Sequence, residues 1–362
     1  MLAENPKRIM SMFITDRTNE YGLYAISLVK NGEVKEVVID DYFPCQDGSP
    51  CFSKANGNEL WVLILEKCWA KLHGSYERIE AGHAHNVMTD LTGAPSHDFD
   101  IEDTGVDEVW NKLVTGERKG FLMACSAGTT NSSAELLESL GLVAEHSYGL
   151  LKVCEITNES GERIRLCLLR NPWGDFEWNG DWSDTSDLWT TDIKRQCGYN
   201  DEQGLFWMSY SDLCHYFCRI QICQVNDDYH YSFMKASHNR GSYSLMRLIV
   251  FHEGEHHISV SQKDERCFNR HSQYDYSNCR IIVMKIEEDS DSIDGLKVQY
   301  MKGAQGWDRE SHAHFDHLPR GEYFVYVELD WNETTVDTEF CVTCYGASRT
   351  FFLRDEKSLF EQ

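Results

Sequence analysis

Two spacings of apolar residues divide the first 226 positions of the chain into strands and helices. Residues 21–40 alternate apolar and polar side chains on either side of Asn31-Gly32, which predicts a β-hairpin with a tight turn. Between 58 and 72 the large apolar side chains recur every three or four positions, which predicts an amphipathic helix. Further strands are predicted at 120–126, 148–156, 163–171, 206–209 and 217–225, with a short helix at 211–215.

The pattern changes after about residue 226, where short β-branched or alternating runs are separated by turn residues. Such runs predict a β-sandwich, and they lie at 243–251, 256–262, 280–286, 321–329 and 338–345. We therefore expect an α+β region at 1–226, an all-β sandwich at 227–350 and a C-terminal tail at 351–362. The acidic loop at 287–291 could bind a cation, although most such loops are merely solvated.

Composition and charge narrow the possible partners. The net charge of −25, from 34 Lys and Arg against 59 Asp and Glu, argues against nucleic acid and anionic lipid. No stretch approaches 18 uninterrupted apolar residues, so we expect no membrane span, and the first residues do not read as a secretion signal. The 14 Cys show no regular framework, which favours reduced thiols and a cytoplasmic location.

The segment from Arg170 to Asp184 carries the most chemical information, because it combines three Trp with four acids. Asn171 ends one predicted strand and His146 begins its partner, so an antiparallel pair can place both on one wall of a cleft. That pair serves thiolate catalysis, in which an imidazolium stabilises the thiolate and an amide oxygen orients the imidazole. Trp173 would shield the bond between them from water. A lone histidine would usually be an ordinary satisfied side chain, but the combination favours a catalytic role.

Several stretches resemble calpains, the calcium-dependent family of papain-like cysteine proteases. They lie at 38–44, 65–77, 90–93, 146–148, 170–184 and 206–209, with a weaker match to the calpain β-sandwich at 318–323. The resemblance implies the β-rich half of a papain-like protease core followed by an all-β sandwich. By that resemblance His146 corresponds to the catalytic histidine, Asn171 to the orienting asparagine and Trp173 to the tryptophan beside the cleft.

The nucleophile is the main departure from the family. The Gly-Asp-Cys-Trp motif and the oxyanion-hole Gln upstream of it do not occur, and residues 2–6 resemble the end of the same helix. Cys68 is followed by Trp, but it lies on the buried face of the predicted helix and aligns with a non-catalytic position. Glu145 also replaces the Gly that the family has before its histidine. We expect this chain by itself to be inactive, since loss of a nucleophile costs about 10⁶ in rate.

The resemblance also implies a calcium site in the protease core. Glu177 and Asp184 match two acidic ligands, whereas Gln203 and Leu205 stand at the other two acidic positions. Calcium takes about six to eight oxygen ligands, so we expect this site to be weak or lost. The acids at 201–202 could compensate in part.

A second sequence motif resembles a metal site but does not predict a catalytic metal centre. Residues 312–317 fit H-x-H-x-D-H, which occurs in dinuclear zinc hydrolases, but no histidine follows His317 to complete such a centre. The segment leads directly into residues 318–321, which the resemblance implies are a loop before a strand. We therefore expect no catalytic zinc here and, at most, adventitious capture of zinc or nickel.

Two functions follow from these observations. The favoured one is a non-catalytic binding or structural component of a larger protein assembly, for which a cytoskeletal assembly is a plausible setting. The alternative is the C-terminal part of a longer, active calcium-dependent cysteine endopeptidase whose Cys segment lies upstream or on another chain. An apolar face comprising Met10, Met12, Phe13 and Ile14 is expected where the missing half would pack, which favours a covering protein partner.

Overall fold

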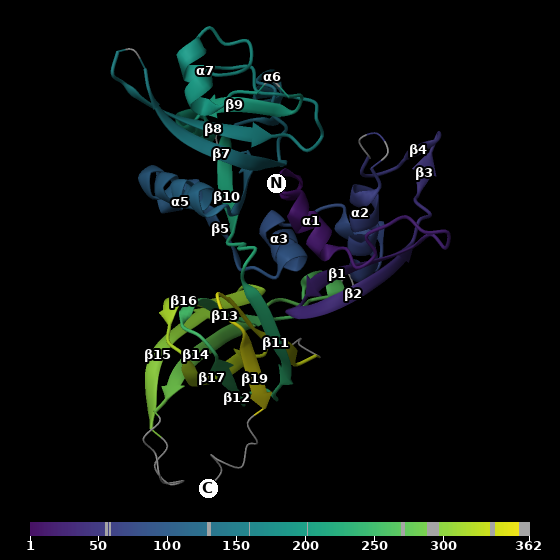
Figure 1. Ribbon diagram of the computed structural model, residues 1–362, viewed down its shortest axis with the longest axis vertical. Coiled ribbons are helices and arrows are strands. Elements are labelled where there is room, and N and C mark those ends of the chain that lie inside the picture. Colours follow the sequence, from purple (N-terminus) through teal and green to yellow (C-terminus); the bar gives the residue numbers. More distant parts are fainter. Residues whose placement is uncertain are drawn as a thin grey trace. The chain divides into compact units, whose positions relative to one another are not determined.

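The computed structural model describes residues 1–354 except 55–56, 58, 129–131, 159, 201, 269–271, 288–296 and 334–336. The chain has an α+β fold with several antiparallel sheets (Figure 1). It forms two compact units, each assembled from three segments. Unit 1 comprises Met1–Ile9, His83–Thr89 and Ser96–Asn226, and unit 2 comprises Met10–Gly82, Asp90–Pro95 and the part from Asp227 onwards.

Unit 1 is built on one six-stranded sheet in the order β5-β10-β6-β7-β8-β9. Its strands are β5 (Ser96–Asp100), β6 (Leu122–Ala127), β7 (Ser147–Thr157), β8 (Arg163–Arg170), β9 (Leu205–Ser209) and β10 (Phe217–Cys223). Each neighbouring pair is antiparallel. Five of these strands were predicted from the sequence, and β5 was not. The sheet buries Tyr148, Phe206 and Phe217 almost completely, which fixes the strands that lead into the candidate site.

Helices surround this sheet. Those within unit 1 are η1 (Leu2–Glu4), α4 (Ile101–Thr104), α5 (Val106–Lys119), α6 (Ala134–Ser139), α7 (Thr191–Cys197) and α8 (Tyr210–Tyr216). Two more, α1 (Pro6–Met12) and α3 (Ala84–Thr92), each span a boundary between the units. Helix α5 was not predicted, although it buries Val109, Trp110 and Leu113 on one face and ends at a left-handed Gly120.

Unit 2 begins with the predicted hairpin, β1 (Leu23–Lys30) and β2 (Glu33–Asp40). Asn31 and Gly32 have φ angles of 53° and 78°, as a tight hairpin turn requires. Helix α2 (Trp61–His73) contacts both strands of the hairpin, and a 3-10 turn, η2 (Tyr76–Ile79), follows it. A two-stranded ribbon, β3 (Cys45–Gln46) and β4 (Ser49–Pro50), completes this segment.

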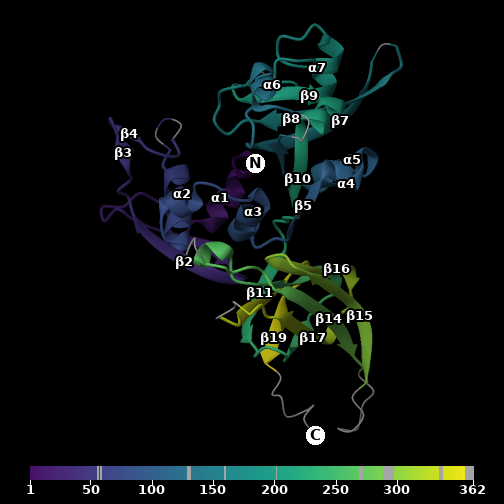
Figure 2. The same ribbon diagram turned by 180° about the vertical axis from the view of Figure 1, so that it is seen from behind.

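The rest of unit 2 is the predicted β-sandwich (Figure 2). One sheet has the order β11-β18-β13-β16 and the other β15-β14-β17-β12-β19. The bounds are β11 (His230–Ser237), β12 (Ser244–Val250), β13 (Gly254–Ser261), β14 (Asn278–Ile286), β15 (Val298–Gly306), β16 (Glu310–Leu318), β17 (Gly321–Asp330), β18 (Glu339–Gly346) and β19 (Thr350–Arg354), with a 3-10 turn, η3 (Glu265–Cys267). Leu248, Ile258 and Val325 lie in the core between the two sheets.

The structure refines the expectations for this part of the chain. The H-x-H-x-D-H segment at 312–317 lies within strand β16, and residues 319–320 connect that strand to β17. Strand β19 continues to Arg354, four residues beyond the predicted end of the sandwich. Most of the acidic loop at 287–291 lies outside the described residues.

The predicted apolar face in residues 10–14 is only partly exposed. Met10 and Ile14 are 56% and 51% exposed, as expected, but Met12 is buried at 6%. Phe13 forms an isolated bridge with the buried Ile26 of strand β1. The prediction was wrong for Met12, because unit 2 itself covers part of this segment.

Candidate active site

His146 and Asn171 lie at the same end of two neighbouring strands of the unit 1 sheet. His146 directly precedes β7 and Asn171 directly follows β8, and the two strands pair with Gly149 opposite Arg170. The register therefore brings the two side chains together across 25 residues of sequence, and His146 Nε2 lies 3.0 Å from Asn171 Oδ1. This is the pairing that the strand pattern predicted.

The Asn171 side chain is fixed by its own hydrogen bonds. It is 2% exposed, and its oxygen accepts a bond from the Trp173 backbone N–H at 3.1 Å in addition to the His146 contact. Its amide donates to the carbonyl of Phe176 at 3.1 Å and to that of Asp175. Because the amide can only donate through nitrogen, these bonds leave the oxygen directed at the imidazole.

Two aromatic rings flank the imidazole. The Trp173 ring lies 4.4 Å from the His146 ring at a tilt of 42°, and the Tyr148 ring meets it edge-on at 5.0 Å. Trp173 is 61% exposed, so it covers the imidazole while its own outer face remains open. Burial lowers the pKa of His146, and the hydrogen bond to Asn171 opposes that shift in part. Near neutral pH the ring is therefore mainly uncharged.

The backbone before the histidine is strained. Glu145 has a φ of 53°, in the left-handed region that favours glycine. Its N–H donates to the Ala127 carbonyl at 3.2 Å, and the Ala127 N–H donates to the His146 carbonyl at 2.9 Å, so strand β6 holds this turn in place. A left-handed residue with a side chain costs about 1 kcal/mol, which gives a physical reason for the Gly that the resemblance implies at this position.

No described thiol hydrogen-bonds to the His146 ring. Cys125 and Cys167 lie in the core of unit 1, where burial raises the pKa of each thiol well above its usual value. Cys68 belongs to unit 2, where its Sγ lies 3.6 Å from the Val37 carbonyl and burial raises its pKa to about 12. Among these three, none has the accessible, low-pKa environment of a nucleophile.

The two predicted calcium ligands are engaged separately. Glu177 Oε1 accepts a bond from the Gly204 backbone N–H at 2.6 Å, and Asp184 Oδ1 accepts one from the Tyr199 hydroxyl at 2.8 Å. Within the described residues, neither acid belongs to a group of three or more side chains placed to hold a metal ion.

The neighbouring positions offer few further oxygen ligands for a calcium ion. Leu205 is buried at the start of β9, and Gln203 is exposed. Glu202 pairs with Arg170 at 3.1 Å, and Asp201 lies outside the described residues. The acids that could have compensated are thus either engaged with a cation or not described.

Two clusters in unit 2 were not predicted. In the first, called here the cation-closed cluster, Lys30 Nζ lies 2.6 Å from Asp264 Oδ2, 2.6 Å from His73 Nε2 and 3.3 Å from Asp90 Oδ2. Arg309 closes the other side, 2.9 Å from Asp90 and 3.2 Å from Asp264. All five side chains are at most 7% exposed. No local sequence signal marks this cluster, because its members come from five separate elements or loops.

The second cluster, called here the histidine triad, comprises Glu255, His257 and His314. The sequence motif contained only His314. An alternating Glu-x-His in a strand was a usable signal for a shared face, but the pairing of that strand with the motif was not visible in the sequence.

Comparison with known proteins places the first 224 residues in a family. The model for the calpain family of cysteine proteases matches residues 1–224. The chain belongs to the calpain family. A calpain-type cysteine protease, ADL1 of Oryza sativa subsp. japonica, is 38% identical over 229 residues, which cover 60% of this chain and 10% of that protein. Calpain-9 of Mus musculus is 37% identical over 215 residues, or 57% of this chain and 31% of the relative.

A third relative gives the same picture. The calpain-1 catalytic subunit of Mus musculus is 34% identical over 212 residues, or 57% of this chain and 30% of the relative. The chain thus spans about a tenth to a third of the length of these calpains. A solved clostridial cysteine protease covers 66% of this chain and 56% of its own at 10% identity, with a TM-score of 0.21, too low to carry an argument.

Proposed function

We propose that residues 1–362 bind rather than cleave, as a non-catalytic or structural component of a larger protein assembly. The observation that carries this proposal is the surroundings of the His146 ring, whose hydrogen bond goes to Asn171 and to no thiol of the described residues. A cysteine protease needs its imidazole beside a thiol to form the ion pair that attacks a peptide. The exposed Glu145 supports the same proposal, because it places a carboxylate where substrate would approach.

Peptide hydrolysis tests this directly. The purified chain should show no turnover of a fluorogenic calpain peptide in calcium, and its background should equal that of a His146→Ala variant. Turnover that is lost in His146→Ala and blocked by a thiol-alkylating inhibitor would overturn the proposal. An unrelated contaminating protease would act equally in both preparations.

The intact geometry of Asn171, which orients the imidazole, favours a second function. Asn171 is buried, fully bonded and aimed at His146, which is the arrangement that a working site requires. In this alternative the chain is the C-terminal part of an active calcium-dependent endopeptidase, with the Cys supplied upstream or by another chain. The thiolate would attack the peptide carbonyl, His146 would protonate the leaving amine, and Asn171 would keep the ring oriented.

Complementation separates the two functions. A fragment carrying the calpain nucleophile segment would be mixed with this chain, and peptide cleavage would be measured with and without His146→Ala and Asn171→Ala. Cleavage that needs both fragments and falls in both variants supports the endopeptidase. Absence of cleavage from a mixture that forms a stable complex supports the binding component.

Calcium binding at Glu177 and Asp184 is proposed to be weak or lost. The support is that each carboxylate already accepts a hydrogen bond and that buried Leu205 occupies one position of the set. Titration calorimetry with calcium should show no micromolar site in unit 1. A micromolar site that disappears in Glu177→Gln would contradict this.

We propose that the partners are other proteins in the cytoplasm, including cytoskeletal assemblies. The support is that Met10 and Ile14 are both exposed, since a protein partner can bury exposed apolar side chains. None of the helices in the described part combines the length and apolar character needed to cross a membrane. A purified chain that remains a monodisperse monomer without detergent would count against an obligate partner.

A further inference from the structure

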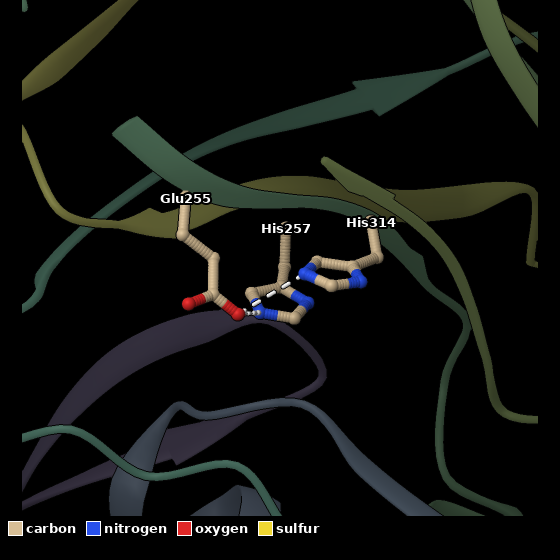
Figure 3. Close-up of side chains that lie close together, drawn as sticks. All are labelled: Glu255, His257 and His314. Atoms are coloured by element: carbon tan, nitrogen blue, oxygen red, sulfur yellow. Dashed lines mark hydrogen bonds and ion pairs between the residues drawn. The ribbon is translucent and has the colours of Figure 1, made fainter. Parts of the chain in front are cut away.

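The histidine triad lies on one face of the four-stranded sheet of unit 2. Strands β13 and β16 are antiparallel neighbours, and His257 on β13 lies directly opposite His314 on β16. Glu255 precedes His257 by two positions, so both project from the same face. Figure 3 shows the Glu255 carboxylate directed at both imidazole rings. Two strands that are distant in sequence therefore bring two nitrogens and one oxygen together.

The donor atoms lie close to one another. Glu255 Oε1 is 3.1 Å from His314 Nε2 and 3.7 Å from His257 Nε2. One potential donor atom from each side chain lies within 4.8 Å of the others. The second carboxylate oxygen, Oε2, accepts a hydrogen bond from the Tyr229 hydroxyl at 2.9 Å. Tyr229 thus holds the carboxylate so that Oε1 points at the rings.

The histidine triad is buried on one side and exposed to solvent on the other. The His257 side chain is 1% exposed, that of Glu255 21% and that of His314 34%. An ion can therefore enter past His314, and His257 provides a fixed buried ligand. Asp316 Oδ1 lies 3.8 Å from His314 Nε2 on the open side, where its side chain is 93% exposed.

We propose that Glu255, His257 and His314 bind a divalent transition-metal ion, with Zn²⁺ the foremost candidate. Two imidazole nitrogens and one carboxylate oxygen are ligands that Zn²⁺ takes, with water in the remaining position of a tetrahedron. Ca²⁺ and Mg²⁺ prefer oxygen ligands, so this set selects against both.

Binding requires one ring to turn. The two rings are stacked with centroids 4.3 Å apart and planes within 8° of parallel. A ligand nitrogen directs its lone pair within the ring plane, so two parallel rings cannot both aim at one ion. His314 is a third exposed and lies on the open side, and it is the ring with space to tilt.

The proposal departs from the sequence motif. His312 bonds through Nδ1 to Ser259 at 2.7 Å, and His317 pairs with Glu253 at 3.4 Å on the exposed end of the strand. Only His314 of the three motif histidines joins the triad, and its two partners come from β13. The expectation of no zinc was based on the motif alone, and the ligand set proposed here is a different one.

The test is Zn²⁺ binding by the full chain, measured by titration calorimetry and by equilibrium dialysis with metal analysis. We expect one Zn²⁺ per chain at a site that also takes Co²⁺ with the visible absorption of a tetrahedral ion. His314→Gln and Glu255→Gln should each weaken Zn²⁺ binding by about tenfold or more. The matched control, His317→Gln, alters an exposed histidine of the same motif and should leave the affinity within about twofold.

Three outcomes would overturn the proposal. Equal weakening in His317→Gln would show surface chelation by the motif, and unchanged binding in Glu255→Gln and His314→Gln would place the ion elsewhere. Absence of Zn²⁺ binding would leave the triad as a hydrogen-bonded stack without a metal. Both test variants alter partly exposed side chains, and circular dichroism with thermal unfolding would show that each is folded.

Discussion

Unit 2 contains two histidine and carboxylate clusters that satisfy their charges in different ways. In the cation-closed cluster, Lys30 and Arg309 contact both Asp90 and Asp264, so the carboxylates already have cations. In the histidine triad, Glu255 contacts two imidazoles and a tyrosine hydroxyl. The comparison teaches that ligand geometry alone does not indicate a metal site, because lysine and arginine side chains can already supply the positive charge that an ion would bring.

The pKa values of the two carboxylates in the cation-closed cluster are shifted in opposite directions. Burial raises the pKa of Asp90, and the charges of Arg309 and Lys30 only oppose that shift. Burial also acts to raise the pKa of Asp264, but the His73 imidazole 3.9 Å away and the charges of Lys30, Arg266 and Arg309 hold that pKa well below its ordinary value. Asp264 is therefore the carboxylate through which this cluster stabilises the fold at neutral pH.

The largest expected effect comes from breaking the cation-closed cluster. Arg309→Met leaves two buried carboxylates with one cation fewer, and we expect a loss of about 3–5 kcal/mol in the free energy of unfolding. Urea unfolding followed by tryptophan fluorescence measures it. Arg280→Met is the matched control, because its pair with Glu328 is about half exposed and should contribute less than about 1 kcal/mol. Similar losses in both variants would show that the cluster has no special role.

The next largest expected effect is a loss of folding stability at acid pH. Because the folded-state pKa of Asp264 is depressed, its contribution is present above the ordinary value of 3.8 and is lost as the pH falls below it. We expect the wild-type free energy of unfolding to drop by about 1–3 kcal/mol on this account as the pH falls from about 4. In Asp264→Asn this drop should be absent, although the variant starts from a lower stability.

Asp90 provides the control of opposite sign. Its folded-state pKa is raised, so its contribution falls as the pH rises through the window above 3.8. Asp90→Asn should therefore retain the loss of stability at acid pH. If Asp264→Asn and Asp90→Asn respond to pH alike, the two carboxylates do not differ as described.

A smaller effect is expected in the histidine triad without metal. Glu255→Gln keeps the shape of the side chain at a partly exposed pair, so the free energy of unfolding should fall by about 1 kcal/mol or less. Added Zn²⁺ should raise the melting temperature of the wild type by more than that of Glu255→Gln at the same Zn²⁺ concentration. A metal-free loss as large as that of Arg309→Met would remove the contrast between the two clusters.

The smallest effect concerns unit 1, which has no such cluster among its described residues and serves as an outside reference. Glu145→Gly relieves the left-handed backbone before His146, and after the entropic cost of glycine we expect a gain of about 0.5 kcal/mol. The same change at Glu138, an exposed position in helix α6, should instead cost about 0.5–1 kcal/mol. A loss in Glu145→Gly would show that the Glu145 side chain stabilises the turn.

Local pattern was enough for some of these features. The β1–β2 hairpin follows from alternation on either side of Asn31-Gly32, and the pairing of His146 with Asn171 needs only one further hairpin. Helix α5 was missed although its apolar residues have helical spacing and Gly120 marks its end. Helical spacing and a terminal glycine are therefore sufficient to predict α5 from the sequence.

Other features could not be predicted from local pattern. Strand β15 places most of its side chains in solvent and lacks an apolar alternation, so nothing distinguishes it from a loop. The Lys30–Asp264 contact joins residues 234 positions apart and depends on how the hairpin segment packs on the sandwich of the same unit. Likewise, His257 meets His314 only because β13 and β16 are neighbours in the sheet.

The hydrogen bond between the Asp264 backbone and the Asn31 side chain, 2.9 Å long, has a practical consequence for dissecting this polypeptide. A truncation after residue 226 matches the family boundary closely, yet it would remove Asp264 and Arg309 while keeping Lys30, His73 and Asp90. The remnant would expose the hairpin face that the sandwich covers, and Lys30 and Asp90 would lose their contacts with Asp264 and Arg309. Expression boundaries should therefore keep the hairpin and the sandwich on one molecule.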